Sequence, residues 1–147
     1  MTFRFENQGA TPVYLLEQCS LAFQVAACAD GYQQSLALQG TCTINCEDAS
    51  DGGGCIACGE CMSQTLEVLP GQAKDVSWSG LQYTFDHYQG CQCHYEHVAP
   101  AGLYRVSVPV WDKYFDPMQG EQPSASKQAQ AYFELPGSGT VVISIGD

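Results

Sequence analysis

The length, composition and charge of the chain narrow its class before any motif is considered. A chain of 147 residues, 45% of them hydrophobic, is long enough to form a single domain over residues 1–147 with its own core. Sixteen acidic residues against five basic ones give a formal charge of -11, which argues against nucleic acid and anionic membranes as partners. No apolar run approaches the roughly 18 residues that a transmembrane helix needs.

The number of cysteines indicates whether the protein works in an oxidising or a reducing compartment. Disulfides persist in oxidising compartments, whereas clustered thiols in a reducing cytosol usually hold metal. Nine cysteines in a chain with only five Lys and Arg residues therefore favour an exported protein of the periplasm, the cell surface or the extracellular space. Residues 1–5 lack a charged region followed by a hydrophobic signal core, so we expect a trimmed mature chain to which Met1 was added.

The beginning of the chain predicts extended structure. Residues 2–6 alternate polar and apolar side chains, and residues 12–16 begin a second strand after a turn, which predicts a hairpin. A further strand is expected over residues 21–28. Residues 30–31, Asp-Gly, suit a tight turn, so this strand is expected to turn there and return from Tyr32.

Strand signals continue through the rest of the chain at roughly ten-residue spacing, without a convincing run of helical period. A Pro-Gly turn separates two of these strands, and a long surface loop is expected over residues 112–127. The last two strands are expected to form a hairpin around residues 136–139. The expected strands cover residues 36–38, 42–46, 65–69, 75–78, 82–88, 103–110, 129–135 and 140–145.

The clearest strand is residues 103–110, where Tyr104 and every second residue after it are apolar on one face. Pro109 suggests that this strand lies at an edge or is ending there. The pattern as a whole predicts an antiparallel β-sandwich. Its core is expected to include Phe23, Trp78, Val106, Val108, Val141 and Ile143.

Three short motifs resemble a known family. They are VLPGQ at residues 68–72, VSWSG at 76–80 and APAGLYRV at 99–106. Together they resemble bacterial immunoglobulin-like modules of the intracellular proteinase inhibitor type. The resemblance implies an immunoglobulin-like β-sandwich, and no residue matches an inhibitory reactive site. The cysteines depart from that module and are more similar to those of cysteine-rich exported or lipoprotein-type bacterial domains.

The cysteine-rich loop, residues 42–61, is an insertion that needs cross-links to be ordered, because it contains three consecutive glycines. Cys55, Cys58 and Cys61 could ligate zinc, with Cys42, Cys46 or His94 as the fourth ligand. Local disulfides explain the same spacing, and we favour them because export is expected. The disulfide candidates are Cys19, Cys28, Cys42, Cys46, Cys55, Cys58, Cys61, Cys91 and Cys93.

A second cluster, residues 86–97, holds two cysteines, three histidines and two carboxylates. Cys93, His94 and His97 are the most natural ligands there for zinc or copper. The alternative is a loop pinned by disulfides, with solvated histidines.

A catalytic reading depends on Cys58 and Cys61. The sequence Cys58-Gly59-Glu60-Cys61 resembles the centre of thioredoxin-like oxidoreductases, but the strand before it and the full helix after it are not expected here. No cofactor is implied and no other catalytic constellation is recognisable. We therefore expect a non-catalytic exported binding or structural module whose partner is a protein or cell-surface component. The alternatives are a zinc- or copper-binding protein and a thiol-disulfide oxidoreductase.

Overall fold

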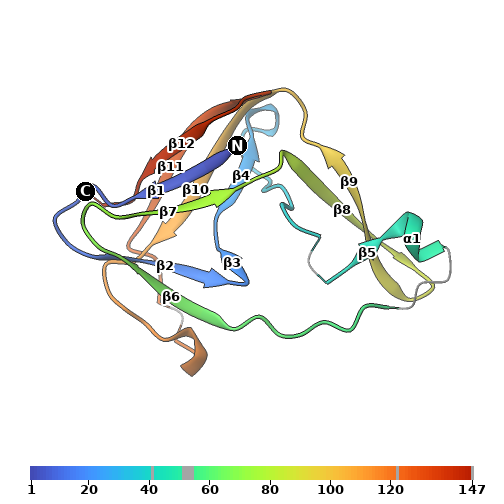
Figure 1. Ribbon diagram of the computed structural model, residues 1–147, viewed down its shortest axis with the longest axis horizontal. Helices are drawn as coiled ribbons and strands as arrows, with labels where there is room; N and C mark the ends of the chain where they lie inside the picture. The colour runs from blue at the N-terminus through green and yellow to red at the C-terminus, as the bar shows by residue number, and fades with distance from the viewer. Residues whose placement is uncertain (41, 51–54, 122, 147) are drawn as a thin grey trace.

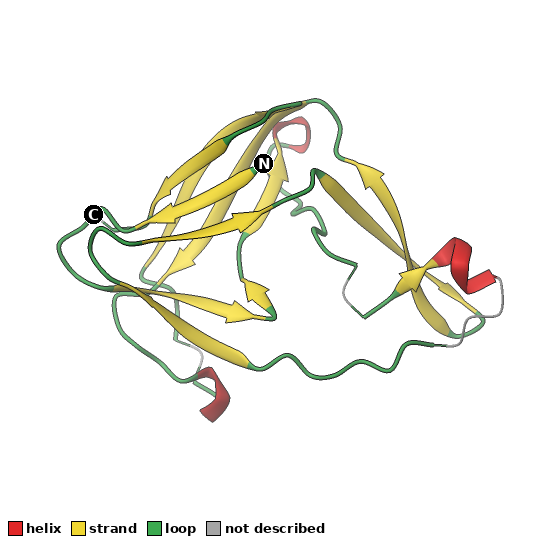
Figure 2. Ribbon diagram, in the orientation of Figure 1, coloured by secondary structure: helices red, strands yellow, loops and turns green. Residues whose placement is uncertain are grey.

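The computed structural model describes residues 1–40, 42–50, 55–121 and 123–146, and it is mostly β-structure in two parts (Figures 1 and 2). The larger part, called the body, contains nine of the strands that the described residues form. The smaller part, called the stapled lobe, comprises residues 42–50, 55–62 and 81–98 and lies to the right of the body in Figure 1. None of the described helices is long and apolar enough to span a membrane.

The body holds most of the secondary structure. Two short 3-10 turns, Cys28–Asp30 and Pro117–Gln119, lie in its connections. Its strands are β1 (Thr2–Glu6), β2 (Val13–Gln18), β3 (Ser20–Leu21), β4 (Gln24–Ala27), β6 (Ser63–Val68), β7 (Ala73–Ser77), β10 (Gly102–Val110), β11 (Lys127–Leu135) and β12 (Thr140–Ser144).

The body strands form three sheets, in the orders β12-β1-β7, β11-β10-β4 and β3-β2-β6. Strand β1 pairs in parallel with β12, so that Phe3 lies opposite Val141 and Phe5 opposite Ile143. The other ladders of the body are antiparallel. This topology joins the beginning of the chain to its last strand.

Two predicted hairpins are wrong, and a third is formed only in part. Strands β1 and β2 do not pair with each other, and β11 does not pair with β12, although short turns connect them. Residues 30–31 do not begin a returning strand either. They belong to a 3-10 turn that ends at Gly31, and the chain returns only as far as a single bridge between Ala26 and Ser35. In the two hairpins the chain passes to another sheet, because the apolar faces must meet across one core.

That core contains residues from all three body sheets. Four of the six predicted core residues, Trp78, Val106, Val108 and Ile143, are buried. The other two, Phe23 and Val141, are partly buried and pack against the core. The ring centroids of Phe3 on β1 and Phe133 on β11 are 5.2 Å apart, so the first and second sheets meet directly.

Strand β10 is central in its sheet, and Pro109 is tolerated there because it lies beyond the stretch that pairs with β4. Strand β4 pairs only with Tyr104 to Ser107, and β11 pairs along the whole of β10. Pro109 therefore lies beyond the region where both sides of β10 are paired. The missing N–H of proline removes no bond to β4. The predicted alternation holds, with Tyr104, Val106, Val108 and Val110 buried.

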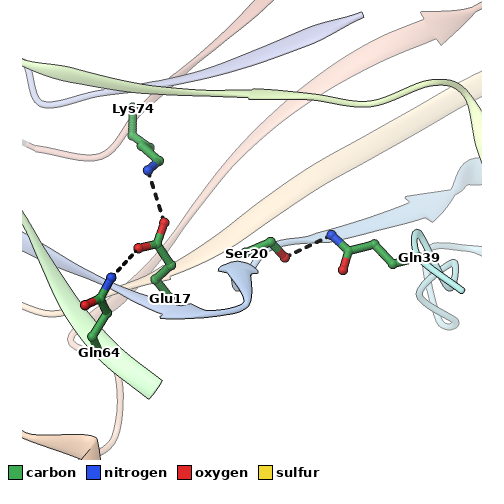
Figure 3. Close-up of polar contacts among 5 residues, drawn as sticks. All are labelled: Glu17, Ser20, Gln39, Gln64 and Lys74. Atoms are coloured by element: carbon green, nitrogen blue, oxygen red, sulfur yellow. Dashed lines mark hydrogen bonds and ion pairs between the residues drawn. The ribbon is translucent and has the colours of Figure 1, made fainter. Parts of the chain in front are cut away.

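A polar cluster joins three strands of the body (Figure 3). Glu17 on β2 accepts hydrogen bonds from Gln64 on β6 at 2.7 Å and from Lys74 on β7 at 3.0 Å. The amide of Gln64 and the ammonium of Lys74 hold the pKa of Glu17 below its usual value of 4.5. Nearby, Gln39 donates to Ser20 at 2.9 Å, which ties the segment leading to the lobe onto β3.

Candidate functional site

The lobe is a small sheet carried on one hairpin. It consists of β5 (Ile44–Asn45), α1 (Cys46–Ser50), β8 (Leu81–Tyr88) and β9 (Cys91–Val98), in the sheet order β5-β9-β8. Strands β8 and β9 pair along their full length, and the turn between them places Gln89 at φ 49° and Gly90 at φ 84°. Two left-handed residues give the twist that a two-residue hairpin requires.

Four disulfides stabilise the lobe and tie it to the body. Cys46 joins Cys93 between α1 and β9, and Cys55 joins Cys91 beside the hairpin turn. The Cα atoms of the pairs lie 4.9 to 5.4 Å apart, in the ordinary range for disulfides. The remaining bonds are Cys42–Cys58, within the cysteine-rich loop, and Cys19–Cys61, which links the lobe to the turn between β2 and β3.

The lobe has almost no hydrophobic core of its own. Among the described residues of the lobe, its buried cluster contains only Cys46, Ala49 and Cys93, with Ile44 partly buried against them. An apolar cluster of this size cannot offset the conformational entropy of ordering the surrounding loops. The cross-links therefore supply most of the order of the lobe.

Among the described acidic and histidine side chains of the lobe, that of His94 is the most buried, with 9% of its surface exposed. Its Nδ1 lies 2.7 Å from the hydroxyl of Thr43, and that hydroxyl donates its proton to the carbonyl of Gly40 at 3.0 Å. Since the hydroxyl has one proton, Nδ1 must carry the hydrogen that His94 donates to it. In a neutral imidazole with its hydrogen on Nδ1, the other nitrogen, Nε2, is an acceptor.

Two further side chains lie beside the His94 ring. Glu96 lies two residues along β9, on the same face, with its carboxylate 3.8 Å from Nε2 of His94. The ring of Tyr83 meets the ring of His94 edge-on at 5.3 Å. Burial, followed by the charge and the hydrogen bond of Glu96, raises the pKa of Tyr83. The three side chains form a polar group on one face of the hairpin.

The lobe carries fixed charges of one sign. The sequence has no Lys or Arg between Arg4 and Lys74, or between Lys74 and Arg105. The described lobe residues with fixed charge are therefore carboxylates, and they are Glu47, Asp48, Glu60, Asp86 and Glu96. In the body, by contrast, Arg4 pairs with Asp75 and Lys74 with Glu17.

Aromatic and apolar side chains lie exposed among these carboxylates. Phe85 has 45% of its surface exposed, Tyr95 has 40% and Val98 has 78%, and Tyr88 beside the turn is also exposed. An apolar cavity of about 380 Å³ opens where the lobe meets the body, with Trp78, Leu81 and Leu135 among its lining residues. A rigid hairpin with exposed aromatic side chains has the composition of a binding surface.

The structure separates most of the predicted metal ligands. Cys55, Cys58, Cys61 and Cys93 each lie in a disulfide to a different partner, so their thiolates are not free to ligate. His97 lies on the opposite face of β9 from His94 and contacts Thr84 at 2.9 Å. Within the described ranges, no group of three or more His, Cys, Asp or Glu side chains is placed to hold a metal ion.

The arrangement at Cys58 and Cys61 also differs from that of thioredoxin-like enzymes. Cys58 bonds to Cys42 and Cys61 to Cys19, rather than to each other. Residues 55–62 form no regular element, and β6 rather than a helix follows them. Part of the predicted cysteine-rich loop, residues 51–54, lies outside the described residues.

Cys28 is the one of the nine cysteines that forms no disulfide, and its side chain is exposed. A hydrogen bond with this thiol is the main reason that the pKa of Tyr32 rises to about 12. The guanidinium of Arg105 lies over the ring of Tyr32, 4.9 Å from its centroid, and donates to the Tyr32 carbonyl.

Sequence reasoning did not identify Gly40, Thr43 or Tyr83 as members of a site, and it included Glu96 as one of the two carboxylates of the cluster at residues 86–97. The sequence contains part of the evidence for this site, because His94 and Glu96 lie on one face if residues 91–98 form a strand. Comparison of the chain with protein-family models, with curated proteins and with solved structures found no match.

Proposed function

We propose that this protein is an exported, non-catalytic binding module, with the stapled lobe as its binding surface and the body as its support. The observation that carries the proposal is the combination of four disulfides with exposed aromatic side chains on the β8–β9 hairpin. Disulfides of this number suit an oxidising compartment of the periplasmic or cell-surface type. Rigid presentation lowers the entropy lost when a partner binds.

The test of this proposal is chemical. Protein secreted into an oxidising compartment should lose two hydrogens for each of its four disulfides and retain one alkylatable thiol, at Cys28. An insulin-reduction assay should give no turnover. Turnover that disappears in the Cys58→Ser variant would replace the binding proposal with an oxidoreductase.

For the body, the proposal is an immunoglobulin-like β-sandwich of the type that the sequence motifs resemble. It is supported by the contact of Phe3 in one sheet with Phe133 in another, which share one core. An experimental structure in which these two sheets do not face each other would contradict it.

Metal binding is a second candidate function, because the free Nε2 of His94 lies 3.8 Å from the carboxylate of Glu96. A histidine whose other nitrogen is held by a donor bond is oriented as metal-ligating histidines usually are. Two protein ligands with water would give a weak site for zinc or copper. Elemental analysis after dialysis against zinc should find about one ion per chain, lost in His94→Gln and retained in His97→Gln; equal loss in both variants would reject this site.

A further inference from the structure

Strand β8 is an edge strand of the lobe sheet, since the sheet order ends with it. The segment before the lobe covers only the beginning of this edge, where Tyr83 donates its N–H to the carbonyl of Ala37 at 2.9 Å. From Thr84 to Tyr88, the outer side of β8 has no backbone partner among the residues that the structure describes. An unpaired edge is a template for another strand.

The direction of the Tyr83 bond identifies which groups the edge offers. In an antiparallel ladder, alternate residues point their N–H and C=O groups toward the same neighbour. Because Tyr83 points away from β9, Phe85 and His87 point away as well. The N–H of His87 is occupied locally by the carboxylate of Asp86 at 2.8 Å. The outer edge therefore offers the N–H and C=O of Phe85 and the C=O of His87.

Disulfides and a tight turn hold the strands of this edge in place. The Cys46–Cys93 and Cys55–Cys91 disulfides fix the strand that backs it, and the Gln89–Gly90 turn closes the hairpin. The Phe85 side chain is half exposed beside the free backbone groups. A partner strand would thus gain main-chain bonds and an apolar contact on a surface that is already ordered.

Charge selects the partner. The lobe has carboxylates at Asp86 and Glu96 along the hairpin and lacks lysine and arginine. A second copy of this chain would bring a formal charge of -11 against the same surface, and like charges oppose pairing. A segment rich in lysine or arginine would be attracted and steered to this edge.

We propose that the free edge of β8 binds an extended, lysine- or arginine-rich segment of a partner protein by strand addition. This inference rests on the proposed binding function of the lobe and specifies the chemistry of its partner. Main-chain bonds at Phe85 give the alignment, and the carboxylates of the lobe give the preference for basic side chains.

The probe is a ten-residue acetylated peptide that alternates lysine and valine, titrated into the intact oxidised protein. On binding, exchange of the Phe85 amide hydrogen should slow by about tenfold or more, because the bonded N–H exchanges only after opening. The Thr84 amide faces β9 and serves as the internal control. A peptide that alternates glutamate and valine should not bind.

A second peptide separates strand addition from simple charge attraction. The same lysine-valine sequence with every backbone nitrogen methylated keeps its charges but cannot donate main-chain bonds. It should bind about tenfold more weakly, the expected effect of losing one or two hydrogen bonds. Equal binding of both peptides, with unchanged exchange at Phe85, would overturn strand addition while leaving the lobe as a charged binding surface.

Two pairs of variants repeat the test on the protein side. Phe85→Pro removes the outward N–H, and Phe85→Val keeps it, so only the first should weaken binding of the lysine-valine peptide by about tenfold. Asp86→Asn should weaken binding about threefold, whereas Glu134→Gln, which removes the same charge from the body, should not. Intact mass, to count disulfides, verifies that each variant is folded. Absence of lysine-valine peptide binding to the wild type would overturn this inference, whereas the proposed function is judged separately by the secretion and turnover measurements.

Discussion

The body and the stapled lobe are ordered by different means. In the body, large apolar side chains from three sheets fill one core, and residues such as Phe3, Leu15 and Val106 are fully buried. In the lobe, two buried cysteines and one alanine make up the buried apolar cluster, and disulfides link almost every segment. The difference shows that covalent cross-links can replace a core where the surface must stay polar and exposed.

Reduction of the disulfides is expected to have the largest effect, because it should destabilise the lobe much more than the body. A disulfide that closes a loop of about fifteen residues contributes roughly 3 kcal/mol, and three of the four lie within the lobe. Reduced protein should therefore lose hydrogen-exchange protection in β8 and β9 while β10 and β11 keep theirs. Equal loss in both parts would show that the body depends on the lobe.

Removing a body core side chain should have the next largest effect. Phe3 is fully buried and its ring meets those of Phe23, Trp78 and Phe133. Phe3→Ala should lower the free energy of unfolding by about 3–5 kcal/mol, measured by urea denaturation. Phe85→Ala, at an exposed phenylalanine of the lobe, should change it by less than about 0.5 kcal/mol. Similar losses in both variants would contradict the assignment of the core to the body.

Gly40, in the segment that leads into the lobe, tests whether packing against His94 also contributes to the stability of the lobe. A Cβ at Gly40 would lie 2.8 Å from the ring of His94, a closer approach than real side chains make. Gly40→Ala should destabilise the lobe by about 1–3 kcal/mol, because the loop or the ring must shift. The matched variant is Gly59→Ala, where a Cβ would meet nothing within 4 Å. The nuclear magnetic resonance shifts of the His94 ring should move in the first variant and stay unchanged in the second.

The smallest expected effect is the contribution of Glu17, a body residue, to the pH dependence of stability. The pKa of Glu17 is lower in the folded state than its usual 4.5, so ionised Glu17 stabilises the fold at pH values above 4.5. That contribution is lost as the pH falls through the lowered pKa. In Glu17→Gln this part of the acid dependence should be absent, so the two proteins should converge in stability as the pH falls below 4.5. An unchanged pH profile in the variant would show that the Lys74 and Gln64 bonds do not stabilise the fold.

The sequence predicted the body better than the lobe, and the reason is visible in particular residues. Alternation from Tyr104 to Val110 identified β10, because one face of that strand enters the core. For residues 86–97 the sequence predicts a ligand cluster or a loop, since polar side chains lie on both faces of β9. Without a hydrophobic core in the lobe, no alternation marked that strand.

The pairings of strands and cysteines depend on the whole fold. Eight cysteines allow about 105 pairings, and spacing alone could not single out bonds such as Cys19–Cys61 across 42 positions. The short connections between β1 and β2 and between β11 and β12 favoured hairpins locally. Burial of the apolar faces of these strands in one core favours pairing with other strands, and no local motif in the sequence predicts those pairings.

The parallel pairing of β1 with β12 bears on how the chain matures as it is made. Ribosomes synthesise residues in order, so Phe3 has no partner on the β12 side until Val141 has been translated. Every cysteine up to Cys93 has appeared by then. Oxidation of the lobe can accordingly begin on a nascent polypeptide whose β1 still lacks one flanking strand, and body closure becomes the late step.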